Sequence, residues 1–311
     1  SFPMMRNALV TLCLVVSATA IPAVDFVDND EYVSTPAGYM LRRCVHELPD
    51  GATVRTETTG DRTVLDAQGK YLKTLPACNA TADKPMFRDL PTDYDGWTAY
   101  TAYQTPDAAG FDAFLGYFSV PDLPKSTPQV LYLFTGLQNI DWIPKVDPMP
   151  KTAFDIIQPV LQYPCGFLDK HWCVKSWYVT VDSGASYSTA KKVNPGDAIF
   201  GNMTRVGPTS WFISSVINST GEATSITADH PRLKTQPWAY NTLECYGCSG
   251  CNTYPTQPSV FSELQLTQNG KPVEAKWEVN PKPSQSTQCH EGATVKSSSL
   301  VDLYFDGAAQ K

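Results

Sequence analysis

Prolines interrupt this chain too often for long helices. The 25 prolines are spread along all 311 residues, and each one removes a backbone donor and disrupts helical structure at its position. Between them lie short runs of aromatic and β-branched residues, separated by turn signals such as Asn194-Pro195-Gly196-Asp197 and Asn269-Gly270. This is the pattern of β-strands, so an all-α fold is excluded.

The predicted strands are numerous and carry no helical periodicity between them. They include Val130–Phe134, Ser176–Val181, Ala198–Phe200, Trp211–Asn218, Val260–Leu266, Lys276–Val279 and Leu300–Phe305. Such a series predicts an all-β fold, an antiparallel β-sandwich or jelly roll of the concanavalin-like type. With 42% hydrophobic residues the chain can bury a sizeable core.

The N-terminus predicts export. Arg6 precedes the apolar run Ala8–Val16 and the small-residue motif Ala18-Thr19-Ala20, so residues 1–20 are typical of a secretory signal peptide. No later run approaches the roughly 20 apolar residues that span a bilayer, and no membrane anchor is expected. Glycosylation sequons at Asn79, Asn202 and Asn218 agree with a secreted, extracellular glycoprotein.

The remainder divides into two parts. Residues 21–95 have short β-like runs and end in a Pro- and Asp-rich stretch, which predicts a small N-terminal module and a linker. This module could act as a removable pro-segment. Residues 96–311 form the main β-sandwich domain.

Eight cysteines lie outside the predicted signal peptide. An even number in an exported chain predicts up to four disulfides, and the sequence alone does not determine which cysteines pair. Two precede residue 80 and six follow residue 160, so each region could close its own bridges. The cluster Cys245-x-x-Cys248-x-x-Cys251, with Cys289 further on, has spacings that zinc sites also use. The oxidising compartment favours disulfides, and no metal or other cofactor is expected.

Charge and motifs exclude several functions. The formal net charge is −7 and basic residues never cluster beyond a pair, which argues against nucleic-acid binding. The Gly-x-Ser-x-Gly, His-Glu-x-x-His, P-loop and Gly-x-Gly-x-x-Gly motifs do not occur. Asp182-Ser183-Gly184 is similar to the turn of pepsin-like peptidases, but no second such aspartate follows, so a hairpin turn is favoured.

Two polar positions in strand-like segments are candidates for chemistry. In Ile156–Tyr163 the strand period of two places Gln158 and Gln162 on one face. A buried amide needs a partner, so it lines a groove or makes a specific hydrogen bond. Glu244 lies in a segment with few other charges, where burial raises the pKa of a carboxyl toward the range of acid–base catalysis.

These segments also occur in a recognisable order. The runs are Ile157–Leu161, Ser176-Trp177-Tyr178, Val193–Ile199, Ile217–Gly221, and Thr242-Leu243-Glu244 followed by Val260-Phe261. Over roughly residues 128 to 268 the chain resembles the eqolisin-type glutamic peptidases, and its arrangement is more loosely similar to neprosin-like secreted proteins. It departs from the eqolisin pattern at Val179, where an acidic residue is usual, and in the cysteines after Glu244.

The resemblance implies a β-sandwich peptidase that cleaves a polypeptide substrate at acidic pH. Glu244 would be the general base that activates water, and the Gln158 amide would donate to the developing oxyanion. We assign substrate-binding roles to Trp177, Tyr178 and Gln138, and Gln138 is also the alternative to Gln158 as the catalytic glutamine.

A non-catalytic role is the other hypothesis. The seven tryptophans and 15 tyrosines could provide stacking platforms for a carbohydrate, since jelly rolls often serve as lectins. In that case Gln158 is a core hydrogen-bonding residue, and the protein is a secreted glycan- or surface-binding β-sandwich.

Overall fold

A computed structural model describes residues 31–78, 87–88, 95–125, 129–144, 154–166, 169–181, 183–282 and 289–305. The predicted signal peptide, the sequon at Asn79 and the Asp182 side chain lie outside these residues. No helix among the described residues is long and apolar enough to cross a membrane.

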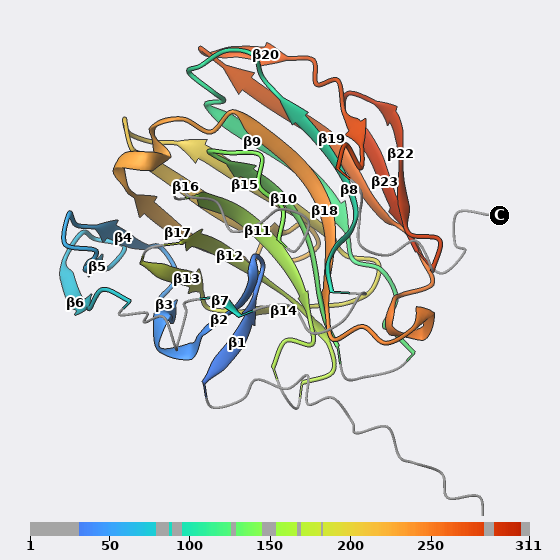
Figure 1. Ribbon diagram of the computed structural model, residues 1–311, viewed down its shortest axis with the longest axis horizontal. Helices are drawn as coiled ribbons and strands as arrows, with labels where there is room; N and C mark the ends of the chain where they lie inside the picture. Colours follow the sequence, from blue (N-terminus) through green and yellow to red (C-terminus); the bar gives the residue numbers. More distant parts are fainter. Residues whose placement is uncertain are drawn as a thin grey trace, which may run out of the picture.

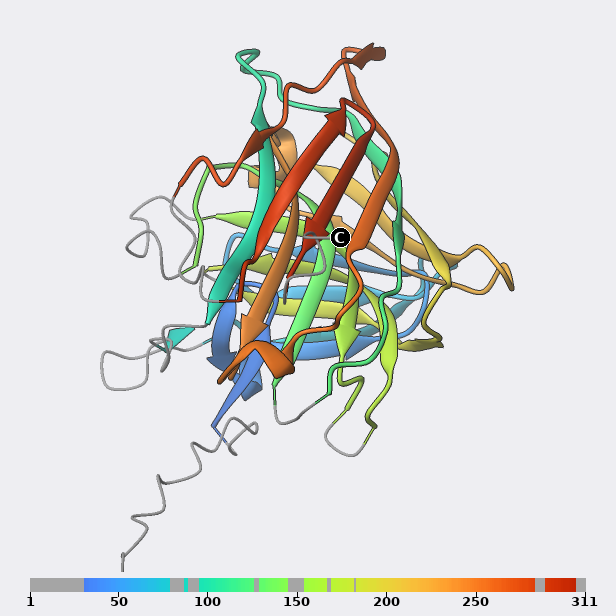
Figure 2. The ribbon, with the colours of Figure 1, turned by 90° about the vertical axis from the view of Figure 1, so that its right-hand side faces the viewer.

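Two large β-sheets lie face to face and form a sandwich (Figures 1 and 2). Sheet I has the strand order β21-β8-β18-β10-β11-β12-β13-β3, with β14 paired to β12. Its strands are β3 (Val45–Leu48), β8 (Gly96–Gln104), β10 (Val130–Gln138), β11 (Asp155–Tyr163), β12 (Trp172–Thr180), β13 (Gly184–Ser188), β14 (Lys191–Val193), β18 (Trp238–Tyr246) and β21 (Glu278–Val279).

Sheet II has the order β22-β23-β19-β9-β15-β16-β17-β4-β5-β6, with β20 paired to β19. Its strands are β4 (Ala52–Thr56), β5 (Arg62–Leu65), β6 (Tyr71–Leu75), β9 (Ala113–Ser119), β15 (Ala198–Arg205), β16 (Ser210–Ile217), β17 (Ala223–Asp229), β19 (Ser259–Gln268), β20 (Lys271–Val273), β22 (Gly292–Ser297) and β23 (Leu300–Tyr304). The all-β sandwich predicted from the sequence is therefore confirmed.

A small third sheet consists of β1 (Tyr32–Thr35), β2 (Gly38–Leu41) and β7 (Phe87–Arg88). The helical segments of the described residues are short 3-10 turns: η1 (Arg42–Cys44), η2 (Pro231–Lys234) and η3 (Cys251–Thr253). We refer to β1, β2 and their connecting turn as the N-terminal hairpin. Figure 1 shows it in blue, lying across sheet I.

Sheet I is buried on both of its faces. Leu131 and Leu133 of β10 point toward sheet II into the main core, whereas their neighbours Tyr132 and Phe134 point to the other side, because side chains alternate along a strand. We call this other side the outer face. Every residue of β11, β12 and β18 is buried. The outer face carries its own apolar cluster, to which the N-terminal hairpin and also Trp142, Ile143 and Phe154 contribute.

Part of the predicted N-terminal module belongs to the two large sheets. β3 pairs in parallel with β13 of sheet I, and β4 pairs in parallel with β17 of sheet II. The Arg62 side chain is fully buried and joins the sheets by donating to the Ala185 carbonyl and the Ser186 hydroxyl, both at 3.1 Å. The role of residues 21–95 as a removable segment remains a prediction.

The eight cysteines among the described residues all form disulfides, which confirms that prediction. The pairs are Cys44–Cys78, Cys165–Cys173, Cys245–Cys248 and Cys251–Cys289. The four cysteines with zinc-site spacing, Cys245, Cys248, Cys251 and Cys289, are thus bonded in two disulfides.

Candidate active site

Gln158 and Glu244 lie on the same face of sheet I. Both side chains point to the outer face. On β11, Gln158 lies two residues from Ile156 and from Val160, which belong to the outer cluster. On β18, Glu244 lies two residues from Tyr246 of the same cluster. Strand β10 lies between them and pairs with both strands. The spacing of two along each strand therefore places both groups on one surface.

The pair is not directly opposed across β10. Gln158 lies level with Gly136 and hence with Tyr240, whereas Glu244 lies level with Tyr132 and hence with Gln162. From strand geometry the two backbones are about 10 Å apart across the sheet and about 13 Å apart along it. Any chemistry that uses both groups therefore involves what lies between them, which is Tyr240 and the polypeptide on the outer face.

Glu244 is a fully buried carboxyl in an aromatic environment. Its Oε1 accepts a hydrogen bond from the Tyr246 hydroxyl, and its Oε2 has no hydrogen-bond partner among the described residues. Burial raises the pKa of Glu244 well above its usual range, although Tyr246 and the indole of Trp97 favour the charged form. Burial thus favours the protonated form of this carboxyl.

Trp97 reaches Glu244 because of a β-bulge. β8 and β18 change register between Leu243 and Glu244, so that Ala99 faces Leu243 but Trp97 faces Glu244. The extra residue turns Trp97 to the outer face, where it stacks on Trp238 at a ring distance of 5.7 Å. The bulge places an indole beside the buried acid.

The titration of Glu244 predicts a pH-dependent stability. In an unfolded chain the pKa of a Glu is about 4.3, so above that pH the folded protein retains a proton that the unfolded chain has lost. Stability is then greatest below that pKa and declines as the pH rises toward the folded pKa, by up to about 1.4 kcal/mol per pH unit. Urea unfolding of wild type and Glu244→Gln at several pH values from about 4 to 7 measures this contribution.

The Glu244→Gln variant should match wild type at the acidic end and become progressively more stable than wild type toward neutrality. Comparing the two proteins cancels the contributions of His46, Asp155 and Asp229, whose pKa values are also shifted. Parallel stability curves over the whole range would show that Glu244 is not a protonated buried acid.

Gln158 donates to a peptide carbonyl of the chain itself. Its Nε2 lies 3.1 Å from the carbonyl oxygen of Pro36, in the turn of the N-terminal hairpin, and its Oε1 has no hydrogen-bond partner among the described residues. On either side, the Tyr132 hydroxyl donates to Ser34 Oγ at 3.3 Å and the ring of Tyr39 packs edge-on against Tyr246 at 5.3 Å. One short stretch of polypeptide thus contacts Gln158 and the partner of Glu244.

Tyr240 occupies the space between the two candidate residues. Its ring lies over Gly136, where a Cβ would be 2.3 Å from the ring, so only glycine allows this position. Burial raises the pKa of Tyr240 well above its usual range; the neighbouring Gln158 side chain opposes this and the charge of Glu244 adds to it. The pKa of the Tyr240 phenol therefore depends on both Gln158 and Glu244.

The sequence analysis did not single out Tyr240, Tyr246, Tyr132 or Trp97 as site residues. The sequence carried part of this information. One face of β18 holds every second residue of the strand, namely Trp238, Tyr240, Thr242, Glu244 and Tyr246. The same period of two that joined Gln158 to Gln162 would have placed these tyrosines beside Glu244. Trp97 could not have been found in this way, because the bulge changes the alternation of β8.

The three proposed substrate-binding residues lie in different places. Trp177 is on the outer face, where it stacks on Tyr187 at 4.5 Å. Tyr178, the next residue along β12, points between the sheets and donates to Asp155 Oδ1 at 2.6 Å. Gln138 ends β10 and donates to the Trp142 carbonyl at 2.9 Å. Only Trp177 lies beside the N-terminal hairpin.

An opening of about 240 Å³ lies at the edge of the hairpin. It is lined by Val33 and Ser34 of the hairpin and by Gln162, Lys175 and Trp177 of sheet I. The Lys175 ammonium donates to Gln162 Oε1 at 3.0 Å. This opening gives the outer face a polar, positively charged margin next to Trp177.

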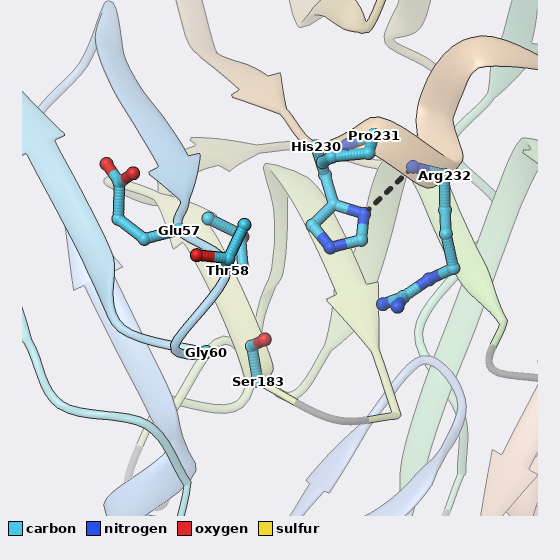
Figure 3. A pocket seen from close by; sticks show the side chains of 8 residues that line it. Glu57, Thr58, Gly60, Ser183, His230, Pro231 and Arg232 are labelled. Atoms are coloured by element: carbon cyan, nitrogen blue, oxygen red, sulfur yellow. Dashed lines mark hydrogen bonds between the residues drawn. The ribbon is translucent and has the colours of Figure 1, made fainter.

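A second pocket of about 280 Å³ lies away from the outer face, and His230, Arg232 and Ser183 line it (Figure 3). Arg232 forms an ion pair with the fully buried Asp155, and its Nη2 donates to Thr180 Oγ1 at 2.7 Å. Nδ1 of His230 accepts from the Arg232 amide at 3.1 Å and lies 3.6 Å from Asp155 Oδ1. These contacts link the lining of this pocket to the buried Asp155 at the start of β11.

No group of three or more His, Cys, Asp or Glu side chains that could hold a metal ion occurs within the described ranges. The arrangement on the outer face consists instead of a donor amide, a buried acid and tyrosine hydroxyls. These groups can bind a peptide carbonyl and carry protons.

No protein-family model matches this chain. No curated protein sequence matches it either. Among solved structures, scytalido-glutamic peptidase with a peptide-based transition-state analogue is 14% identical with a TM-score of 0.48, over 68% of this chain and 98% of that chain. SCP-B, a member of the eqolisin family in complex with the tripeptide Ala-Ile-His, is 14% identical with a TM-score of 0.47, over 68% of this chain and 98% of that chain.

Aspergilloglutamic peptidase from Aspergillus niger is 13% identical with a TM-score of 0.38, over 57% of this chain and 98% of that chain. The eqolisin-type family that the sequence resembles is thus among the solved structures similar to this chain. At these identities and TM-scores the similarity assigns no role to any side chain of this chain.

Proposed function

We propose that this protein is a secreted, acid-active endopeptidase that uses Gln158 and Glu244 on the outer face of sheet I. The observation that carries the proposal is the hydrogen bond from Gln158 Nε2 to the Pro36 carbonyl. The turn of the N-terminal hairpin already lies on this face, with a backbone carbonyl at the amide that would stabilise an oxyanion. The substrate is accordingly a polypeptide.

In this proposal Glu244 acts as the general base. Burial is the first cause of the raised pKa of Glu244, so in this proposal water that enters the opened face lowers that pKa and the carboxyl ionises. The carboxylate then takes a proton from water as the water attacks the scissile carbonyl, and it returns a proton to the leaving amine. Gln158 donates to the oxygen on which negative charge develops. Tyr240, which lies level with Gln158 and on the same strand as Glu244, completes the polar path between them.

Four disulfides support the proposed export, because such bonds persist in oxidising compartments. The exposed sequon at Asn218 lies in the turn after β16 and is accessible for glycosylation. Mass spectrometry of the secreted protein before and after glycosidase treatment tests this assignment.

The direct test is hydrolysis of a denatured protein by the full chain after incubation at acidic pH. We expect cleavage that requires acid treatment and is unaffected by chelators. Binding of glycans on an array, with no cleavage at any acidic pH, would instead support the carbohydrate-binding alternative.

Replacing the donor amide tests the oxyanion role. Gln158→Glu keeps the size of the side chain but removes the N–H donor and adds negative charge. We expect kcat to fall about 10²–10³-fold, the effect of losing one such donor, with a smaller change in KM. Gln104→Glu, the same substitution at an exposed position of β8, is the matched control; equal activity of the two variants would remove Gln158 from the mechanism.

A further inference from the structure

The N-terminal hairpin covers the candidate site, and its second strand β2 also pairs with the two-residue strand β7. Its strands pair over their whole length, and the Arg42 amide donates to the Glu31 carbonyl at 2.8 Å, which closes its open end. Met40 and Leu41 are buried, as is Tyr39 against Tyr246. While the hairpin is in place, the Gln158 amide is bound to the Pro36 carbonyl and is not open to a substrate.

The chain that follows the hairpin is fixed to the body of the protein. Cys44 is bonded to Cys78, and its carbonyl accepts from the buried Arg62 guanidinium at 3.4 Å. β3 and β4 then enter sheets I and II. The sequence contains no cysteine between residue 21 and Arg43, so no disulfide ties the hairpin to the body.

Between the detachable and the fixed parts lies a pair of exposed basic residues, Arg42 and Arg43, in the short turn η1. This turn is three residues long, and its two arginines are exposed between the buried Leu41 and Cys44. Exposed, locally unfolding segments are the preferred sites of proteolytic cleavage.

We propose that Arg42-Arg43 is a processing site for an endopeptidase specific for paired basic residues, and that cleavage after Arg43 frees the hairpin and opens the outer face. Water adds across the Arg43–Cys44 peptide bond, leaving a carboxylate on Arg43 and a new amino group on Cys44. The functional consequence rests on the proposed peptidase function, whereas the cleavage and the opening of the face do not.

The chain provides its own internal control. Lys191-Lys192 is the other pair of adjacent basic residues, but it lies within β14, which pairs with β12. The Lys191 ammonium is also 3.3 Å from Asp50 Oδ2. This pair is held in a sheet and should resist the same endopeptidase.

The test treats the folded full chain with an endopeptidase specific for paired basic residues. We expect one cut, a new N-terminus at Cys44, and release of the fragment ending at Arg43 without reducing agent when the sample passes gel filtration at acidic pH. Arg42→Ala/Arg43→Ala should remain uncut, and Lys191→Ala/Lys192→Ala should be cut like wild type. A synthetic peptide of residues 31–43 should then bind the cut, hairpin-free protein but not the uncut chain.

Hydrolysis of a denatured substrate should rise about 10- to 1,000-fold on cutting, because a covered site is open only in a minor state of roughly 0.1–10%. Cutting at Lys191-Lys192 in preference to Arg42-Arg43, or failure of the synthetic peptide to bind the cut protein, would overturn this inference. Equal hydrolysis before and after cutting would also overturn it while leaving the peptidase function intact. Peptide binding without any hydrolysis would support the inference and reject the peptidase function.

Discussion

Glu244→Gln is expected to lower kcat for peptide hydrolysis by about 10²–10⁴-fold, the range contributed by a positioned general base. The amide has the shape of the protonated acid, so it preserves the hydrogen bond from the Tyr246 hydroxyl, but it cannot take a proton from water. The measurement is initial rates on a denatured protein at acidic pH, after treatment with an endopeptidase specific for paired basic residues.

The matched control is Glu274→Gln, which changes an exposed carboxyl of sheet II's edge region in the same way. It should retain wild-type activity. Tyr240→Phe separates two routes for the proton: a large loss of kcat places the phenol in the path, and no loss means that Glu244 acts directly on water. Wild-type activity in Glu244→Gln would end the assignment of Glu244 as the base.

Asp155→Ala is expected to destabilise the folded protein by about 3 kcal/mol, the lower end of the range for breaking a buried ion pair. Asp155 is fully buried at the start of β11, the strand that carries Gln158, and accepts hydrogen bonds from Tyr178 and Arg232. Burial raises the pKa of this carboxyl, and the Arg232 and His230 charges oppose the rise. Its removal leaves the Arg232 cation and the Tyr178 hydroxyl without their acceptor.

Urea unfolding at neutral pH measures this loss as a lower midpoint at unchanged slope. Asp141→Ala is the control, because Asp141 is 56% exposed and its pair with Lys282, at 3.4 Å, lies at the surface; it should change stability by less than about 1 kcal/mol. Replacing both Asp155 and Arg232 by leucine should recover part of the loss, since no buried charge is then left alone. Equal midpoints for wild type and Asp155→Ala would show that the pair contributes nothing.

The candidate site could be predicted only in part. The period of two in β11 correctly placed Gln158 on a face with Val160, and the scarcity of charge around Glu244 correctly indicated burial. Tyr178 was grouped with Trp177 because the two are adjacent in sequence, yet neighbours in a strand point to opposite faces. Proximity in sequence therefore led to one predicted role for two side chains that lie on opposite faces of sheet I.

What the sequence determined by itself is local and periodic. Alternating aromatic and β-branched runs specify strands and their two faces, prolines exclude long helices, and an even number of cysteines specifies disulfides, because each of these depends on residues close together in the chain. The tertiary structure alone decided the register across β11, β10 and β18, which brings Tyr240 and not Glu244 level with Gln158. It also decided that Pro36, more than a hundred residues before Gln158, supplies the carbonyl bound there. Such contacts follow from how strands distant in sequence stack and from which segment covers the last exposed face, and no local pattern encodes either.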